Sequence, residues 1–213
     1  MAVSGDTLRG WAAAHVTWFR QSAFRLRSES GTSIFIDPWR VPAGAGPADL
    51  ILVTHPHHDH YDRKAIAGLS REGTAVVLPR SCASNGQNAI TPGETFSTAG
   101  IRVTAVPAYN QAKAFHPKGS SWLGYVIEVD GLRVYHAGDT DVIAEMRDLR
   151  PDIALLPIGG LFAMDWRAGA EAARILKAGL AIPMHYGLLL GGRTAGCRFA
   201  CRVGPGAMVL PRG

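Results

Sequence analysis

One short stretch, residues 48–62, restricts what this chain can fold into more than any other. It reads ADLILVTHPHHDHYD. Its apolar run, Leu50 to Val53, is typical of a buried parallel strand. Four histidines and an aspartate follow within six residues: His55, His57, His58, Asp59 and His60. Packing does not explain such side chains at the end of a buried strand, so the stretch predicts a strand that leads into a functional loop.

The loop has the composition of a metal site. Neutral imidazole is the commonest side-chain metal ligand, and a carboxylate adds a harder oxygen donor. His55 and His57 are two residues apart, so in extended backbone they share a side and could bind one ion. Asp59 and His60 follow after a turn, where they could face a second ion. The alternative is a solvated polar loop that binds metal adventitiously.

The order His55-x-His57-x-Asp59-His60 resembles the HxHxDH signature of the metallo-β-lactamase superfamily, where the motif also follows a strand. In that superfamily a histidine, a bridging aspartate and a final histidine complete a two-metal site. This chain has His116 in a long loop, Asp139 in a Gly-Asp-Thr segment and His185 in a Pro-Met-His-Tyr-Gly segment.

The resemblance implies a role for each of these side chains. One ion would be bound by His55, His57 and His116, and the other by Asp59, His60 and His185. Asp139 would bridge the two ions. Asp37, which precedes Pro38, would support the ligand loop by hydrogen bonding, with a simple turn residue as the alternative. His15, His58 and His136 are expected to be structural or exposed.

The match is closest to a subgroup that includes ascorbate-6-phosphate lactonase and many uncharacterised metal-dependent hydrolases. The segments that carry it are 37–39, 55–62, 135–140, 156–160 and 183–187. Two departures stand out. His116 lies in a His-Pro-Lys-Gly context, where Gly-His-Thr is commoner. At Arg20-Gln21-Ser22 the chain lacks a Gly-His or Gly-Gln pair, which could alter the entrance to the site.

Hydrophobic patterning predicts many short strands first and strand–helix units later. The predicted strands are 15–27 as a pair or a bulged strand, 33–37, 50–53, 74–78, 101–106, 122–129, 132–136, 153–157, 180–183 and one around Val209. A turn is predicted at 93–97 and a tight hairpin at Asp130-Gly131. The predicted helices are 63–68, 141–149 and 166–178, with N-caps at Asp62, Asp141 and Asp165 and with Gly68 and Gly179 as C′ residues of the first and last. These patterns indicate one domain over residues 1–213, either α/β or α+β. The resemblance implies an α+β fold, the four-layer αββα sandwich.

Composition limits the remaining classes. No apolar stretch approaches the ~20 residues of a membrane span, and no secretory signal is recognised. Three cysteines, Cys82, Cys197 and Cys201, do not form a disulfide framework, so we expect a cytoplasmic protein with reduced thiols. A net charge of +5 permits an anionic substrate without requiring one. The arginines are scattered, which makes nucleic acid an unfavoured partner. Assembly into a homo-oligomer stays open.

The expected function is hydrolysis with two divalent metal ions. Two cations about 3.5 Å apart share a water and lower its pKa toward 7, giving a metal-bound hydroxide. Asp59 would be the catalytic residue that positions this hydroxide. Zinc is the first expectation, and manganese or iron also suits a site without cysteine.

The expected substrate is a small-molecule ester, lactone or phosphodiester. An anionic or polar group on it could meet Tyr109, Asn110, Lys113 or Lys118, or these could be solvated loop residues. The alternatives are a metal-dependent nuclease acting on RNA or DNA, a redox protein that uses the same ligands for iron, and a metal-binding protein without catalysis.

Overall fold

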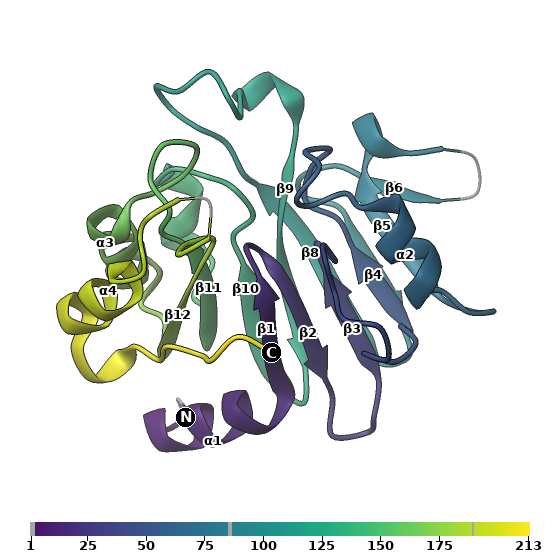
Figure 1. Cartoon of the computed structure of the whole chain (residues 1–213), viewed down its shortest axis with the longest axis horizontal. Helices are drawn as coiled ribbons and strands as arrows, with labels where there is room; N and C mark the ends of the chain where they lie inside the picture. Colours follow the sequence, from purple (N-terminus) through teal and green to yellow (C-terminus); the bar gives the residue numbers. More distant parts are fainter. Residues whose placement is uncertain (1–2, 85–86, 189) are drawn as a thin grey trace.

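Two six-stranded mixed sheets pack face to face, with helices on their outer faces (Figure 1). The computed structural model describes residues 3–84, 87–188 and 190–213. The family resemblance predicted this arrangement of α+β layers, and the prediction is confirmed.

The first sheet has the order β1-β2-β3-β4-β5-β6. Its strands are β1 (Val16–Arg20), β2 (Ala23–Arg27), β3 (Ser33–Ile36), β4 (Leu50–Leu52), β5 (Ala75–Pro79) and β6 (Asn88–Ile90). The strands β3 to β6 run parallel, whereas β1 to β3 pair antiparallel. Because β3 and β4 are parallel neighbours, the loops that follow them leave the sheet side by side.

Strand β4 is buried on both faces, which explains the unbroken apolar run that precedes the histidine loop. Leu50 and Leu52 join the core between the two sheets. Ile51 and Val53 point the other way, into a second cluster beneath the helix α2 (Arg63–Leu69). Successive side chains of a strand alternate between its faces, so a strand covered on both sides needs apolar residues at every position.

The second sheet has the order β12-β11-β10-β9-β8-β7. Its strands are β7 (Thr95–Thr98), β8 (Ile101–Pro107), β9 (Leu123–Val129), β10 (Leu132–His136), β11 (Ile153–Pro157) and β12 (Leu180–Met184). The predicted hairpin joins β9 and β10, and both turn residues, Asp130 and Gly131, have positive φ. Strands β10, β11 and β12 are parallel, so the loops that follow them emerge at one edge of the sheet.

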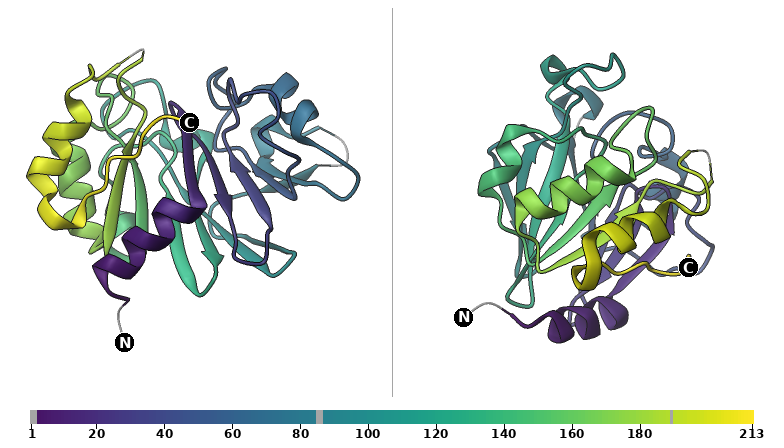
Figure 2. Two further views of the ribbon diagram at one scale, coloured as in Figure 1. Left: turned by 60° about the horizontal axis from the view of Figure 1, so that its bottom comes forward. Right: turned by 90° about the vertical axis from the view of Figure 1, so that its left-hand side faces the viewer.

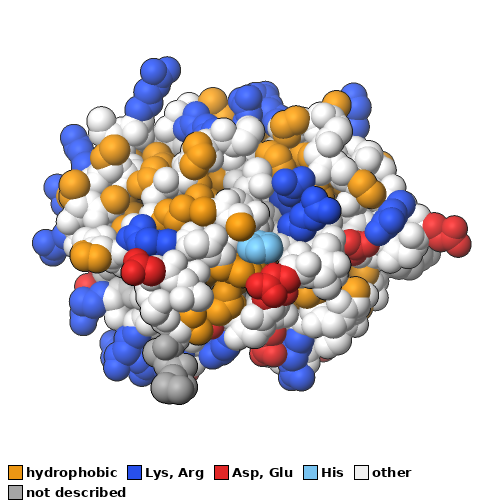
Figure 3. Space-filling model, turned by 90° about the horizontal axis from the view of Figure 1, so that it is seen from below, with side chains coloured by type: hydrophobic (Ala, Val, Ile, Leu, Met, Phe, Trp, Pro, Cys, Tyr) orange, Lys and Arg blue, Asp and Glu red, His pale blue; other side chains and the backbone are white. Residues whose placement is uncertain are grey.

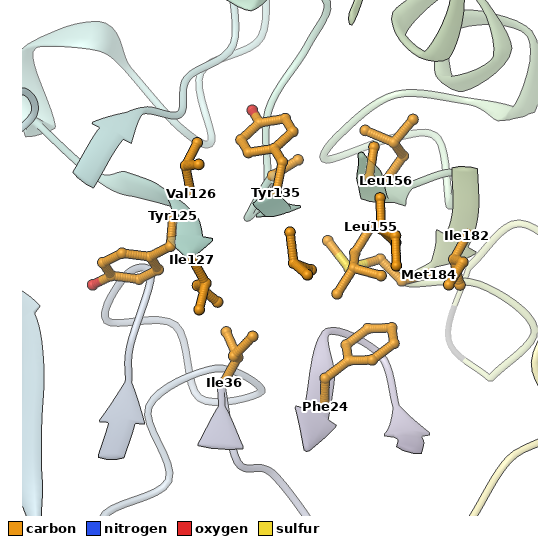
Figure 4. Packing of buried hydrophobic residues seen from close by; sticks show 14 of the residues in the cluster. Phe24, Ile36, Tyr125, Val126, Ile127, Tyr135, Leu155, Leu156, Ile182 and Met184 are labelled. Carbon is orange, nitrogen blue, oxygen red and sulfur yellow. The ribbon is translucent and has the colours of Figure 1, made fainter. Parts of the chain in front are cut away.

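The core lies between the sheets (Figure 4). Phe24 and Ile36 rise from the first sheet toward Ile127 and Leu155 of the second. Tyr125 is fully buried, and its hydroxyl donates to the carbonyl oxygen of Val53 at 2.5 Å, which ties the second sheet to the strand that carries the histidine loop.

Helices form the outer layers. Besides α2 they are α1 (Gly5–His15), α3 (Trp166–Leu176) and α4 (Ala195–Val203), with short 3₁₀ helices at Arg80–Cys82, Lys118–Ser120, Ala144–Asp148 and Gly204–Gly206. Figure 2 shows α3 and α4 side by side over the second sheet. None of the described helices has the length and apolar character needed to cross a membrane. On the face in Figure 3, Lys and Arg side chains stand apart instead of forming one stripe.

Several local predictions are wrong. Residues 5–15 form α1, which the sequence reading missed, so the first strand begins at Val16. Residues 95–98 are the strand β7 instead of a turn, and β6 was not predicted. The C-terminal segment contains α4, which packs against α3, and Val209 lies outside any strand. In α4 the buried Ala195 and Phe199 are four residues apart, the spacing of one helix face.

Three predicted helix boundaries are also wrong, for reasons of tertiary contact. Asp141 does not cap a helix at 141–149. Its carboxylate accepts from the backbone amide of Gln111 and pairs with Lys113, and only a 3₁₀ helix follows. Gly68 lies inside α2. Helix α3 ends at the left-handed Lys177, while Gly179 provides room for Leu8, which a Cβ there would hit.

Candidate metal centre

The seven predicted ligands converge where β4, β10 and β12 end. Three sets of ligand atoms each lie within 4.8 Å of one another: His55, His57 and His116; His55, His60 and Asp139; and Asp59, His60 and His185. The first and third sets have the membership that the resemblance implied for the two ions. That these side chains bind metal stays a prediction, whereas their convergence is an observation.

Asp139 lies at the centre of the cluster. Its Oδ2 is 3.6 Å from Nε2 of His60, 3.6 Å from Nε2 of His116 and 3.4 Å from Nε2 of His185. His116 belongs to the first set and the other two to the third. One carboxylate oxygen therefore faces the ligand atoms of both sets, which is the position that a bridging ligand needs.

The cluster leaves polar atoms buried without partners. Among the described residues, Nε2 of His60, His116 and His185 and Oδ1 of Asp139 have no hydrogen-bond partner. Buried polar atoms are nearly always paired, so four that converge indicate a group that protein atoms do not supply. Imidazole nitrogens and carboxylate oxygens are donors that suit a divalent transition metal. The residues present therefore fit the metal ions that the superfamily implies.

Electrostatics keep most of these side chains in their metal-binding forms. Burial lowers the pKa of His55 and His57, and it lowers the pKa of His116 to about 4, so these rings are neutral at pH 7. Burial would also lower the pKa of His60, but the neighbouring carboxylates, Asp139 foremost, raise it to about 9. His60 is therefore the ligand that must lose a proton when an ion binds.

The two carboxylates of the cluster stay ionised. Burial opposes their ionisation, but contact with His185 and the charge of His60 hold the pKa of Asp59 below its usual range. Proximity to His185, His60 and His116 likewise favours the ionised form of Asp139 and lowers its pKa. Both side chains therefore present negative oxygens to a cation at neutral pH.

Asp37 supports two of the histidines. Its carboxylate accepts from the Thr54 amide at 2.8 Å, from the Thr54 hydroxyl at 2.7 Å and from Nδ1 of His60 at 2.7 Å. Thr54 Oγ1 lies 2.9 Å from Nδ1 of His55, and because its own proton points to Asp37, it accepts from that nitrogen. The network thus places a proton on Nδ1 of both rings, so each would bind a metal through Nε2. Nε2 of His55 lies 3.0 Å from Nδ1 of His57, and His60 must give up its Nε2 proton when an ion binds. These are the contacts expected of a residue that orients ligands.

His116 is held by different partners. Its Nδ1 lies 3.0 Å from Oδ1 of Asn110 and 3.0 Å from the carbonyl oxygen of Phe162, and it donates to both. The backbone amide of Asn110 also donates to the carbonyl oxygen of His116 at 2.7 Å. These contacts aim Nε2 of His116 at the cluster despite its unusual His-Pro-Lys-Gly context.

The position of His185 depends on its own backbone conformation and on a nearby glycine. His185 has a φ of 57°, in the left-handed region. A Cβ at Gly159, in the neighbouring loop after β11, would collide with the carbonyl oxygen of His185. Only glycine lets the two loops pack this closely, which gives a physical reason for the Ile158-Gly159-Gly160 segment.

The three remaining histidines lie outside the cluster, as expected. The side chain of His58 is 81% exposed. His136 is buried beneath the site, where Nε2 donates to the carbonyl oxygen of Ser22 at 2.9 Å and Nδ1 accepts from the Gly138 amide. His15 stacks on Trp11 at the end of α1.

A cavity of about 270 Å³ opens onto the cluster. It is lined by Gln21, His57, His58, Asp59, Phe115, His116, Asp139, Phe162, His185 and Leu190. A larger cleft of about 690 Å³ lies along α3 and α4, but none of its lining residues belongs to the cluster. Side-chain chemistry, and not size, therefore identifies the smaller cavity as the candidate site.

Gln21 is a residue of this cavity whose role sequence reasoning did not identify. It sits in the β1–β2 turn with a φ of 46°, and its carbonyl oxygen accepts from the His185 amide at 2.9 Å. The residue is 1% exposed, and neither polar atom of its side chain has a partner among the described residues. The departure at Arg20-Gln21-Ser22 was the available signal, and it marks the wall of the cavity.

The unpartnered side-chain amide of Gln21 should lower the stability of the fold and contribute to substrate binding. We expect Gln21→Met to keep or raise the melting temperature, because a buried unsatisfied amide costs about 1–3 kcal/mol. The same change should lower kcat/KM for a cleaved substrate by about tenfold, the worth of one hydrogen bond. Gln111→Met is the matched control, because the side-chain amide of Gln111 does have a partner, the carbonyl oxygen of Val142. It should lose stability slightly and keep kcat/KM. The reverse pattern would assign Gln21 a structural role.

Comparison with known proteins agrees with the fold and the cluster. Residues 15–185 match the beta-lactamase superfamily domain. A UPF0173 metal-dependent hydrolase of Nitratidesulfovibrio vulgaris is 36% identical over 197 residues, covering 81% of this chain and 80% of that protein. One from Myxococcus xanthus is 38% identical over 201 residues, covering 81% and 70%.

Solved structures extend the comparison. A protein of Parabacteroides distasonis is 29% identical with a TM-score of 0.82, covering 93% of each chain. Igni18, a metallo hydrolase from Ignicoccus hospitalis, is 29% identical with a TM-score of 0.75, covering 93% of this chain and 95% of that one. The narrower resemblance to ascorbate-6-phosphate lactonase is not confirmed by these matches. The chain belongs to the metallo-β-lactamase superfamily and, within it, to the UPF0173 metal-dependent hydrolase family.

Proposed function

We propose that this protein hydrolyses a small-molecule ester, lactone or phosphodiester with two divalent metal ions bound by the seven-residue cluster. The observation that carries the proposal is the position of Asp139, whose Oδ2 lies 3.4–3.6 Å from ligand nitrogens of both sets. A carboxylate placed between two sets of ligands is what a pair of adjacent ions requires.

The cluster has the parts that such a reaction needs. When bound, two ions of this kind lower the pKa of a shared water toward 7 and polarise the bond to be cleaved. Asp59 lines the cavity as an ionised carboxylate, so it can accept a hydrogen bond from the attacking water and orient it. Asp37 fixes the ring of His60, and Asn110 fixes that of His116. Preorganised side chains of this kind lower the barrier because they need not move during the reaction.

The types of ligand in the cluster limit which metals suit it. Five imidazoles and two carboxylates form the three sets, without cysteine. Such ligands suit zinc, and they also suit manganese or iron. Zinc is the first choice of metal that we propose, and a small molecule is the proposed substrate.

Other functions are compatible with the fold alone. CmlA, a diiron β-hydroxylase, shares it with a TM-score of 0.72 at 14% identity. Fold does not fix function, so the choice rests on the site. A nuclease and a metal-binding protein without catalysis are the alternatives that the test must separate from a small-molecule hydrolase.

The test combines metal analysis with a substrate screen. After reconstitution with zinc or manganese, we expect about two ions per chain, one for each three-residue set. The loaded protein should cleave one of the esters, lactones or phosphodiesters, should lose this activity on chelation and should regain it with metal. Failure to bind either metal contradicts the proposal. Cleavage of RNA alone favours the nuclease, and metal binding without any hydrolysis favours the metal-binding protein.

A further inference from the structure

Part of the lining of the cavity is apolar. It consists of Phe115 from the loop before β9, Phe162 from the loop after β11 and Leu190 from the loop after β12. The rings of Phe115 and Phe162 meet edge to face, with centroids 4.5 Å apart. Phe115 is nevertheless 46% exposed. An exposed aromatic side chain at the mouth of a cavity is typical of a surface that binds an apolar ligand.

Among the described residues, no Lys or Arg side chain lines this cavity. The two lysines of the adjoining loop have partners elsewhere: Lys113 pairs with Asp141, and Nζ of Lys118 lies 3.3 Å from Oε1 of Glu145. A carboxylate or phosphate on the substrate's side group would therefore be buried against phenyl rings without a partner, which is costly.

We propose that this cavity selects small esters or lactones whose uncharged, apolar side group packs against Phe115, Phe162 and Leu190. The inference rests on the proposed hydrolysis and narrows its substrate class, and it disfavours substrates with an anionic side group. The size sets a limit. A volume of about 270 Å³ equals that of roughly nine water molecules at ~30 Å³ each, so the cavity holds a group of about six carbon atoms beside the reacting bond.

Binding of hydroxamic acids tests the selection without relying on turnover. Hydroxamates chelate transition metals, so a series from acetohydroxamic to hexanohydroxamic acid anchors one end at the ions and varies the apolar group. In calorimetric titration of the zinc-loaded protein, the dissociation constant should fall about three- to fourfold per added methylene. Succinic monohydroxamic acid, with a carboxylate in the chain, should bind no better than acetohydroxamic acid.

Substitutions of the apolar lining residues test which side chains contact the apolar group of the hydroxamate. Phe115→Ala and Phe162→Ala should weaken hexanohydroxamate binding by about tenfold or more, the transfer term for several lost ring carbons, and leave acetohydroxamate binding unchanged. Leu161→Ala is the matched control: Leu161 is 61% exposed and next to Phe162, but it does not line the cavity. It should leave the whole series unchanged.

Two results overturn the inference: affinity that does not depend on chain length, or tightest binding by the anionic hydroxamate. Failure of the proposed hydrolysis gives a different pattern, in which the loaded protein shows the chain-length series but cleaves no ester. If no metal binds, the apolar wall is tested in the metal-free protein with hexanol by ligand-observed NMR. Saturation transfer should then be lost in Phe162→Ala and kept in Leu161→Ala.

Discussion

Asp139→Ala should deprive the protein of metal at both sets of ligands at once. Oδ2 of Asp139 faces His116 of the first set and His60 and His185 of the third. Removal of an outer partner of a ligand typically weakens metal binding by about 10–100-fold, and loss of a shared ligand should cost each site at least that much. Metal content after dialysis against a weak chelator, measured on purified protein, should fall from about two ions per chain to well below one.

Asp152→Ala is the matched control for Asp139→Ala. Asp152 lies just before β11, outside the cluster, where its carboxylate accepts from the Arg133 backbone amide at 2.8 Å. This variant should keep its metal. If Asp139→Ala instead loses one ion and binds the other with unchanged affinity, Asp139 is a terminal ligand, and the two sets do not share it.

The ligands could be predicted because their positions follow from local patterns. The run Leu50 to Val53 marks a strand that is buried on both faces, and the histidine loop follows directly. Asp139 and His185 come after two strands of one parallel group, so the sheet itself brings them to the same edge. Residue types and their positions at strand ends were enough to predict that these side chains cluster. The superfamily resemblance supplied the assignment of the ligands to two metal ions.

The walls of the cavity could not be predicted in the same way. Phe115, Phe162 and Leu190 come from three loops that only the folded chain brings together. Each lies in a segment without periodicity, and large apolar residues usually join a core. Their position beside the ligand cluster depends on contacts across the fold, such as the hydrogen bond from His116 to the carbonyl oxygen of Phe162.

Asp141 shows how a long-range contact overrides a local signal. An aspartate before a polar–apolar segment is a good N-cap, and this pattern predicted a helix over residues 141–149. In the structure the carboxylate instead anchors the loop that carries His116, through the Gln111 amide and Lys113. The helix shrinks to the 3₁₀ turn Ala144–Asp148. The sequence pattern identified a residue with a structural task but assigned the wrong partner.

Asp59→Asn should separate a hydrolase from a metal-binding protein. Oδ2 of Asp59 lies 3.5 Å from Nε2 of His185, and the side chain lines the cavity, where its lowered pKa keeps it ionised. Asparagine keeps the size and one oxygen but removes the charge that orients the attacking water. Turnover of the cleaved ester should fall by on the order of 10²-fold or more, the lower range for lost acid–base assistance.

The metal content of Asp59→Asn shows whether the substitution acts on the reaction or on metal binding. The set of His55, His57 and His116 does not include Asp59, so the variant should retain one ion there and bind the second more weakly. Asp62→Asn is the matched control: Asp62 caps α2 by accepting from the Lys64 and Ala65 amides, and asparagine caps a helix equally well. It should keep both metal and turnover. If Asp59→Asn also keeps full metal content and full turnover, Asp59 does not orient the water, and the reaction must rely on another group in the cavity.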